Sequence, residues 1–189
     1  MEWLRELARN ARTELTEREA LARDLVEACY LPGTFRLRSG EVSSFYFDKY
    51  QFEAEPKLLR RVARQLALLI PRDTQVLAGM ELGAIPIATA LSLETNIPAA
   101  FVRKKAKEYG TCRLSEGTEV RSRSICVVED VITTGSQVVA SARDLRALGA
   151  IVNSVLCVIW RGVGEPSLPT GLTCYALFTT GDFQSFLPK

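Results

Sequence analysis

The chain has 189 residues, of which 47% are hydrophobic and 24% charged, and these values are ordinary for a soluble globular domain. Its formal net charge of +2 is too small to indicate a nucleic acid or a membrane surface as partner, so an anion-binding site has to be local. The absence of histidine excludes serine–histidine, cysteine–histidine and histidine–zinc chemistry.

The N-terminal residues 1–15 carry charges every few positions and contain no continuous apolar stretch. We therefore expect neither a signal peptide nor a transmembrane span. Five cysteines are scattered without a Cys-x-x-Cys pair, which favours a reducing cytoplasm.

Two helices are expected near the N-terminus, over residues 3–11 and 17–29, and Thr16 with Glu19 forms a capping box at the start of the second. Alternating apolar and polar residues then predict a hairpin, whose strands span 34–38 and 43–47.

The rest of the chain alternates between helices and strands. Helical periodicity and N-terminal proline predict a helix from residue 56 to residue 70. Further strands are expected over residues 75–79, 99–103, 124–129, 151–160 and 174–178, and further helices over 85–95 and 137–148. Strands separated by helices predict a mostly parallel sheet that binds ligands at the carboxyl ends of its strands.

An apolar strand that ends at Glu129 and Asp130 leads into a turn of small residues and a helix beginning near Ser136. Unpaired N–H groups of such a turn, together with the positive end of the helix dipole, favour a phosphate. The two acids would repel that phosphate unless they face uncharged donors, such as vicinal ribose hydroxyls. The alternative is an ordinary turn with solvated acids and Thr and Ser residues that cap the helix.

This run, residues 127–136, resembles the motif with which type I phosphoribosyltransferases bind 5-phosphoribosyl-1-diphosphate (PRPP). The resemblance implies an α/β fold with a mostly parallel central sheet flanked by helices and a small N-terminal hood, to which the C-terminal strand could also contribute. It implies a single phosphoribosyltransferase domain over 1–189, with helices and the hood hairpin in 1–50 and the PRPP-binding core in 55–165. The PRPP-binding residues implied here are Glu129, Asp130, Val131, Ile132, Thr133, Thr134, Gly135, Ser136 and Gln137.

Four cations fall within residues 103–107, in a polar stretch without periodicity. Alone, this stretch is most simply a solvated run of charge. However, it resembles the catalytic loop of orotate phosphoribosyltransferases, which closes over the other subunit of a dimer. The resemblance implies that Arg103, Lys104 and Lys107 bind pyrophosphate, with Lys107 as the principal catalytic lysine. Tyr109 stands where the family has histidine; it can donate a hydrogen bond but carries no positive charge near pH 7, so pyrophosphate binding should weaken.

Two further segments carry the resemblance. Residues 79–86 resemble the family's pyrophosphate loop, and the hairpin resembles its hood over the base, although Arg38 replaces a lysine. Arg161 resembles an arginine that meets the orotate carboxylate, with Trp160 in place of an acid. The orotate-binding residues implied are Arg38, Tyr46, Phe47, Thr133 and Arg161; the alternative for the two aromatic rings is that they only pack the hairpin.

The resemblance implies orotate phosphoribosyltransferase activity in pyrimidine biosynthesis, with Lys107 and Asp130 as catalytic residues and Asp130 near the developing sugar cation. It also implies Mg²⁺ held mainly by PRPP and water, no metal site made by the protein, and a homodimer with loop exchange. Three alternatives stay open: a phosphoribosyltransferase for another base, a protein-interaction module, and a non-catalytic homologue that binds PRPP or a nucleotide as a regulator. The departures at Arg38, Tyr109 and Trp160 favour the regulator.

Overall fold

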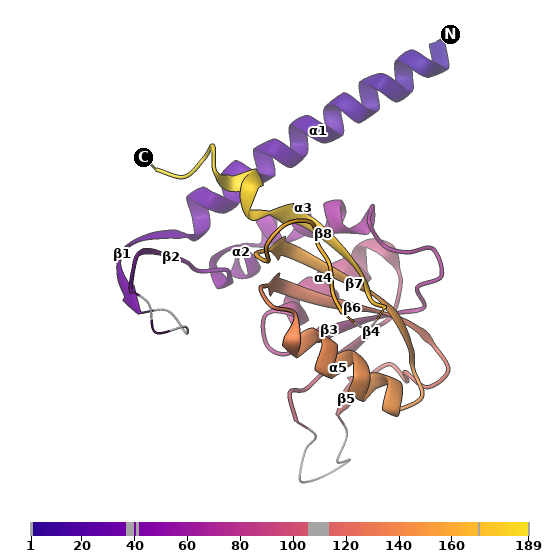
Figure 1. The fold of residues 1–189 in the computed structure, drawn as a ribbon. Helices are drawn as coiled ribbons and strands as arrows, with labels where there is room; N and C mark the ends of the chain where they lie inside the picture. The colour runs from indigo at the N-terminus through magenta and orange to yellow at the C-terminus, as the bar shows by residue number, and fades with distance from the viewer. Residues whose placement is uncertain (1, 37–39, 41, 106–113, 170, 189) are drawn as a thin grey trace.

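The computed structural model describes residues 2–36, 40, 42–105, 114–169 and 171–188, with side chains described from residue 16 onward. Figure 1 shows the fold. The elements in chain order are α1 (Glu2–Cys29), β1 (Tyr30–Arg36), β2 (Val42–Phe47), α2 (Tyr50–Ala54), α3 (Pro56–Ala67), β3 (Val76–Met80), α4 (Ala84–Thr95), β4 (Ala99–Val102), β5 (Ser115–Gly117), β6 (Ser124–Ile132), α5 (Ser136–Ala147), β7 (Ile151–Trp160), β8 (Thr173–Thr179) and the 3-10 helix η1 (Thr180–Phe183).

The central sheet has six strands in the order β5-β4-β3-β6-β7-β8. All neighbouring pairs are parallel except β4 with β5, so the prediction of a mostly parallel sheet is confirmed. Helices α3 and α4 cover one face and α5 covers the other (Figure 1). Because β3 is buried along its whole length, its sequence is a continuous apolar run rather than an alternating one.

Strands β1 and β2 form a separate two-stranded antiparallel sheet, which stands apart from the central sheet and is the predicted hood hairpin (Figure 1). The C-terminal strand β8 does not contribute to the hood, because it pairs with β7 at the edge of the central sheet. The segment after it, η1, packs on α1 instead.

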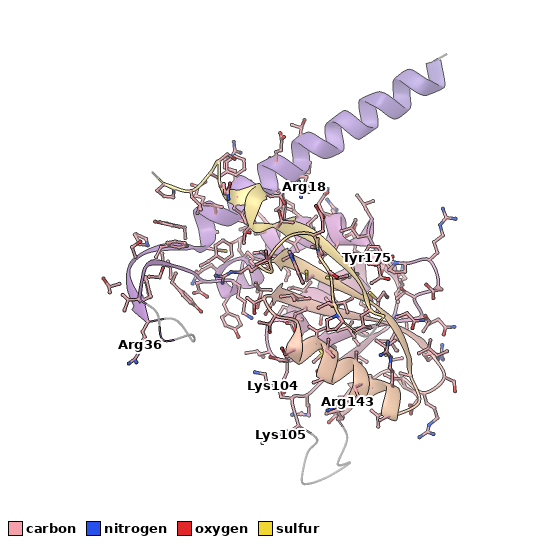
Figure 2. The ribbon with its side chains drawn as sticks, viewed as in Figure 1. Arg18, Arg36, Lys104, Lys105, Arg143 and Tyr175 are labelled. Atoms are coloured by element: carbon pink, nitrogen blue, oxygen red, sulfur yellow. The ribbon has the colours of Figure 1, made fainter. Side chains whose placement is uncertain are left out.

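The two helices expected near the N-terminus are one continuous helix, α1, and the expected start at Thr16 is wrong. Residues with high helix propensity lie on both sides of Thr16, so the helix continues through it. Arg18 holds α1 to the C-terminal segment: its guanidinium donates to the Leu177 carbonyl at 2.9 and 3.1 Å and pairs with Asp182 at 2.8 Å (Figure 2). The N-terminal part of α1 projects away from the body (Figure 1).

Strand β6 continues past Glu129, where the sequence pattern predicted its end. Val131 and Ile132 are β-branched and extend the pairing with β7 as far as Trp160. The two acids therefore lie within the strand and are held by it, rather than in the turn that follows. Within the described ranges, no helix is both long and apolar enough to cross a membrane.

Candidate functional site

A cavity of about 970 Å³ opens at the carboxyl ends of β3, β6 and β7. The hairpin and the start of α2 form its other side. Its lining residues are Arg36, Tyr46, Lys49, Tyr50, Glu81, Leu82, Gly83, Lys104, Glu129, Asp130, Val131, Ile132, Thr133, Thr134, Gly135, Ser136, Gln137, Val138 and Arg161. The cavity lies at the carboxyl ends of the parallel strands, where the sequence pattern predicted a ligand site.

The acid pair, Glu129 and Asp130, forms the floor of the cavity and is almost fully buried. Asp130 accepts hydrogen bonds from the Val131 N–H and from the Lys49 ammonium, with which it also forms an ion pair. Burial raises the pKa of Glu129, and the negative charge of Asp130 raises it further. The Lys49 ammonium thus neutralises the charge of Asp130, and the raised pKa of Glu129 favours its protonated form. A polyanion in the cavity therefore meets little electrostatic repulsion from the acid pair.

Lys49 is a cavity residue that the sequence motifs do not indicate. It precedes α2 and reaches 81 positions along the chain to Asp130. Burial lowers the pKa of Lys49, but its hydrogen bond with Asp130 and the charge of that carboxylate outweigh this effect and raise the pKa overall. The only pattern that could have indicated it is the polar run Asp48-Lys49 directly after the aromatic strand of the hood.

The loop of residues 133–137 lies at the N-terminus of α5, as its sequence predicted. Gly135 is the N-cap residue in a left-handed conformation (φ +71°) and has no side chain to cap the helix, whereas the Thr134 Oγ1 accepts a hydrogen bond from the Ser136 N–H at 3.4 Å. The Thr134 and Ser136 hydroxyl oxygens are 3.0 Å apart. The amides of the first turn and the helix dipole therefore favour an anion in the cavity.

Gly135→Ala should destabilise the fold by about 1 to 3 kcal/mol and weaken anion binding by the loop. A Cβ at Gly135 would lie 2.2 Å from Leu168 Cδ2, and the positive φ adds strain. Gly171→Ala is the matched control, because Gly171 has the same φ of +71° with open space around it. Thermal melts with and without phosphate would measure both effects; equal losses for the two variants would contradict the prediction.

The loop after β3 approaches the acid pair very closely. A Cβ at Gly83 would lie 1.7 Å from Asp130 Oδ2, so a side chain at this position would displace the carboxylate. Glu81 in the same loop accepts a hydrogen bond from the Lys104 N–H at 2.7 Å. The contact ties the start of the basic segment to this loop, and Figure 2 shows Lys104 and Lys105 beyond the end of β4.

Among the other residues expected to bind pyrophosphate, the structure describes Arg103 alone. Arg103 does not line the cavity. Its guanidinium Nε lies 3.6 Å from Glu116 Oε1 on β5, and its backbone N–H donates to the Leu114 carbonyl at 2.9 Å. Lys107 and Tyr109 lie outside the described residues.

Among the residues expected to bind orotate, Tyr46, Thr133 and Arg161 line the cavity. Phe47 does not, because successive residues of a strand point to opposite faces. Its ring packs against Phe183, with 5.8 Å between the ring centroids. Arg38 lies outside the described residues, whereas Arg36, at the tip of the hairpin in Figure 2, lines the cavity.

Trp160 keeps the loop that carries Arg161 in place. Its indole Nε1 donates to the Gly164 carbonyl at 3.0 Å, and the ring leaves no room for a Cβ at Gly162. The Arg161 N–H donates to the Ile132 carbonyl at 2.7 Å. The tryptophan therefore has a structural role at the position where the resemblance would place an acid.

Glu53 lies behind the ion pair and is 6% exposed. Neither of its carboxyl oxygens has a hydrogen-bond partner among the described residues. Burial raises the pKa of Glu53 to about 8, and the charge of Asp130 also raises it. Buried polar groups usually have partners, so the position of this carboxyl requires an explanation.

The Glu53 carboxyl should make stability fall as the pH rises. Between its ordinary pKa of 4.5 and about 8, the folded chain keeps a proton that the unfolded chain loses. Glutamine has no proton to lose, so Glu53→Gln removes this destabilisation. At pH 8 the free energy of unfolding of the variant should exceed that of the parent by on the order of 2 to 4 kcal/mol. The difference should vanish at pH 4.5, and denaturant unfolding at both pH values tests it; a difference independent of pH would contradict it.

The side chains of the cavity offer few ligands for a metal ion. The described part of the chain contains no group of three or more Cys, Asp or Glu side chains that could hold a metal ion. An ion in this cavity would therefore take most of its ligands from a bound molecule and water, as Mg²⁺ commonly does with substrate phosphates.

The comparisons with known proteins agree with this geometry. No family model matches the chain. The orotate phosphoribosyltransferase of Nocardioides sp. is 50% identical over 167 residues, which cover 87% of this chain and 93% of that protein. The orotate phosphoribosyltransferase of Methanocella arvoryzae is 41% identical over 158 residues, covering 82% of this chain and 90% of that protein. The structure of Mycobacterium tuberculosis orotate phosphoribosyltransferase in complex with PRPP superposes with a TM-score of 0.75 at 27% identity, covering 88% of this chain and 98% of that one.

Proposed function

The chain belongs to the orotate phosphoribosyltransferase family, within the type I phosphoribosyltransferases, and we propose that it transfers the phosphoribosyl group of PRPP to orotate. The products are orotidine 5′-monophosphate and pyrophosphate, as in pyrimidine biosynthesis. One observation carries the proposal for this chain: the buried acid pair and the N-terminus of α5 meet in one cavity beneath the hairpin. A ribose with a 5-phosphate needs this combination of acceptors and N–H donors.

The phosphate and the ribose bind to neighbouring parts of β6 and its loop. Residues 133–137 hold the 5-phosphate through the free amides of the helix N-terminus. Glu129 and Asp130 accept hydrogen bonds from the ribose 2- and 3-hydroxyls. Asp130 also lies near C1, where positive charge develops as the bond to pyrophosphate breaks, so its carboxylate stabilises the transition state.

The leaving pyrophosphate meets the loop after β3 and the basic segment after β4. Lys104 is the described cation at the cavity wall on this side. Lys107 remains the proposed catalytic lysine, and Arg103 and Tyr109 remain proposed pyrophosphate ligands on the resemblance alone. For Arg103 to contribute, its guanidinium would have to leave Glu116.

Orotate is a flat ring with a carboxylate, and the opposite wall of the cavity suits both features. Tyr46 presents a half-exposed ring for stacking, and Arg161 offers a planar fork that matches a carboxylate. Thr133 lies between the two sites and can contact the base or the phosphate. Arg38 and Phe47 stay predictions, and Phe47 would need a different orientation to reach the base.

We also propose that Mg²⁺ arrives bound to PRPP, where it neutralises pyrophosphate charge. Mg²⁺ usually keeps several waters and binds through substrate phosphates, so it needs few ligands from the protein. The active unit is proposed to be a homodimer with exchanged loops.

A cytoplasmic location is also proposed. It is supported by the cysteines of the described residues, which form no disulfide: Cys29, Cys126, Cys157 and Cys174.

A steady-state assay with PRPP, Mg²⁺ and orotate tests the function directly. We expect orotate to disappear at a rate proportional to enzyme, and no comparable consumption of adenine or uracil. PRPP binding without turnover would instead support the regulator, and turnover with another base would support the alternative specificity.

A further inference from the structure

We propose that Lys49 has two positions in the ribose site: it pairs with Asp130 before substrate binds and with Glu53 once the ribose hydroxyls occupy Asp130. The inference rests on the proposed function, since it concerns how the same cavity admits the ribose of PRPP. Lys49 and Glu53 are positioning residues, because they act on Asp130 rather than on the reacting atoms.

Each carboxylate oxygen of Asp130 has a hydrogen-bond donor within the protein. Its Oδ1 accepts from the Val131 N–H, and its Oδ2 accepts from the Lys49 ammonium. Gly83 closes in from the other side, since a Cβ there would lie 1.7 Å from Oδ2 and 2.9 Å from Lys49 Nζ. A ribose hydroxyl that binds Oδ2 competes with the ammonium for this crowded side of the carboxylate, so we expect Lys49 to move when the ribose binds.

Glu53 offers Lys49 a second partner at one helical turn. The Glu53 N–H donates to the Lys49 carbonyl at 3.3 Å, so the two side chains share a face of the α2 turn. The Glu53 carboxyl oxygens are buried and have no hydrogen-bond partner among the described residues. A change of lysine rotamer would bring the ammonium to this carboxyl without a movement of α2, and it would satisfy a buried group that is otherwise costly.

The charges around Glu53 fit the exchange. The groups that face it are Asp48 and Lys49 ahead of α2, Asp130 from β6 and the Cys29 thiol from α1. Burial raises the pKa of Glu53 to about 8, so the carboxyl holds a proton near pH 7 while Lys49 stays on Asp130. When the ammonium arrives, Glu53 releases that proton to solvent and becomes the counter-ion of Lys49. Asp130 then faces the ribose as a free carboxylate, which is the form that stabilises positive charge at C1.

Calorimetric titration of the whole protein with PRPP and Mg²⁺ at pH 7 tests the exchange, in buffers of different ionisation enthalpy. Glu53→Gln should weaken PRPP binding about tenfold and remove the release of about one proton. The KM for PRPP should rise similarly while kcat stays within about twofold. In a Lys49→Met background the same Glu53→Gln change should alter PRPP affinity less than about twofold, because no ammonium remains to be received. Glu55→Gln is the matched control: Glu55 is exposed, and glutamine keeps the oxygen that accepts from the Lys57 N–H at 3.2 Å.

Thermal melts accompany each titration, since Glu53→Gln should stabilise the fold while it weakens PRPP binding. A residue with only a structural role would not move the two quantities in opposite directions. Unchanged PRPP affinity in Glu53→Gln, or an equal loss in the Lys49→Met background, would overturn the exchange. Failure of the proposed function looks different, because the unsubstituted protein would then neither bind PRPP nor consume orotate.

Discussion

Asp130→Asn should lower kcat with PRPP and orotate by about two to three orders of magnitude. The asparagine amide can still accept a hydrogen bond from a ribose hydroxyl, but it has no charge to offer the cation that develops at C1. Asp130 is 2% exposed, so little water is present to replace the lost charge. Steady-state kinetics would show the effect mainly in kcat, with a smaller rise in the KM for PRPP.

The same substitution removes the Asp130 partner of Lys49 and should cost about 1.5 to 3 kcal/mol of stability, because the ammonium can still turn to the buried Glu53 carboxyl. Asp130→Asn combined with Lys49→Met should recover much of that stability without recovering turnover, which separates the charge effect from misfolding. Asp144→Asn is the matched control, since the side chain of this partly exposed aspartate on α5 accepts hydrogen bonds from Arg143 and lies outside the cavity lining. A kcat within tenfold of the parent would rule out the catalytic role of Asp130.

The central sheet and the phosphate loop could be predicted because their determinants are local. Apolar runs of four to ten residues bounded by helical patterns give the parallel strands, and the turn at Gly135 follows from a contiguous motif. The boundaries were less predictable. Val131 and Ile132 resemble loop residues next to two acids, and only pairing with β7 shows that β6 includes them.

The electrostatics of the site could not be read from the sequence. The partner of Asp130 is Lys49, at a separation of 81 residues, and no local pattern distinguishes this lysine from an exposed one. Glu53 likewise looks like an ordinary residue of an exposed helix, yet the packing of α2 buries it. Phe47 was expected at the base beside Tyr46, but strand alternation separates their side chains once the hairpin docks.

Lys107→Ala should reduce kcat by about two to four orders of magnitude, because the leaving pyrophosphate would lose its main cation. Lys105→Ala is the matched control, since it removes the same charge two positions earlier at a residue outside the family pattern; it should stay within about threefold. Lys107→Ala activity above a tenth of the parent's would contradict the assignment.

Tyr109→His should raise kcat, and more at pH 6 than at pH 8, because imidazole carries a charge below a pKa near 6.5.

Mixing the two inactive variants tests whether the loop acts across subunits. If it does, a heterodimer of Lys107→Ala and Asp130→Asn subunits has one intact site, made of Asp130 from the first subunit and Lys107 from the second. Random exchange of equal amounts makes about half of the dimers mixed, so about a quarter of the parent activity should return. If each loop serves its own subunit, every site in the mixture keeps one of the two defects and no activity returns. The activity recovered on mixing therefore distinguishes a dimer with shared active sites from a dimer whose active sites are independent. A monomer would also recover no activity.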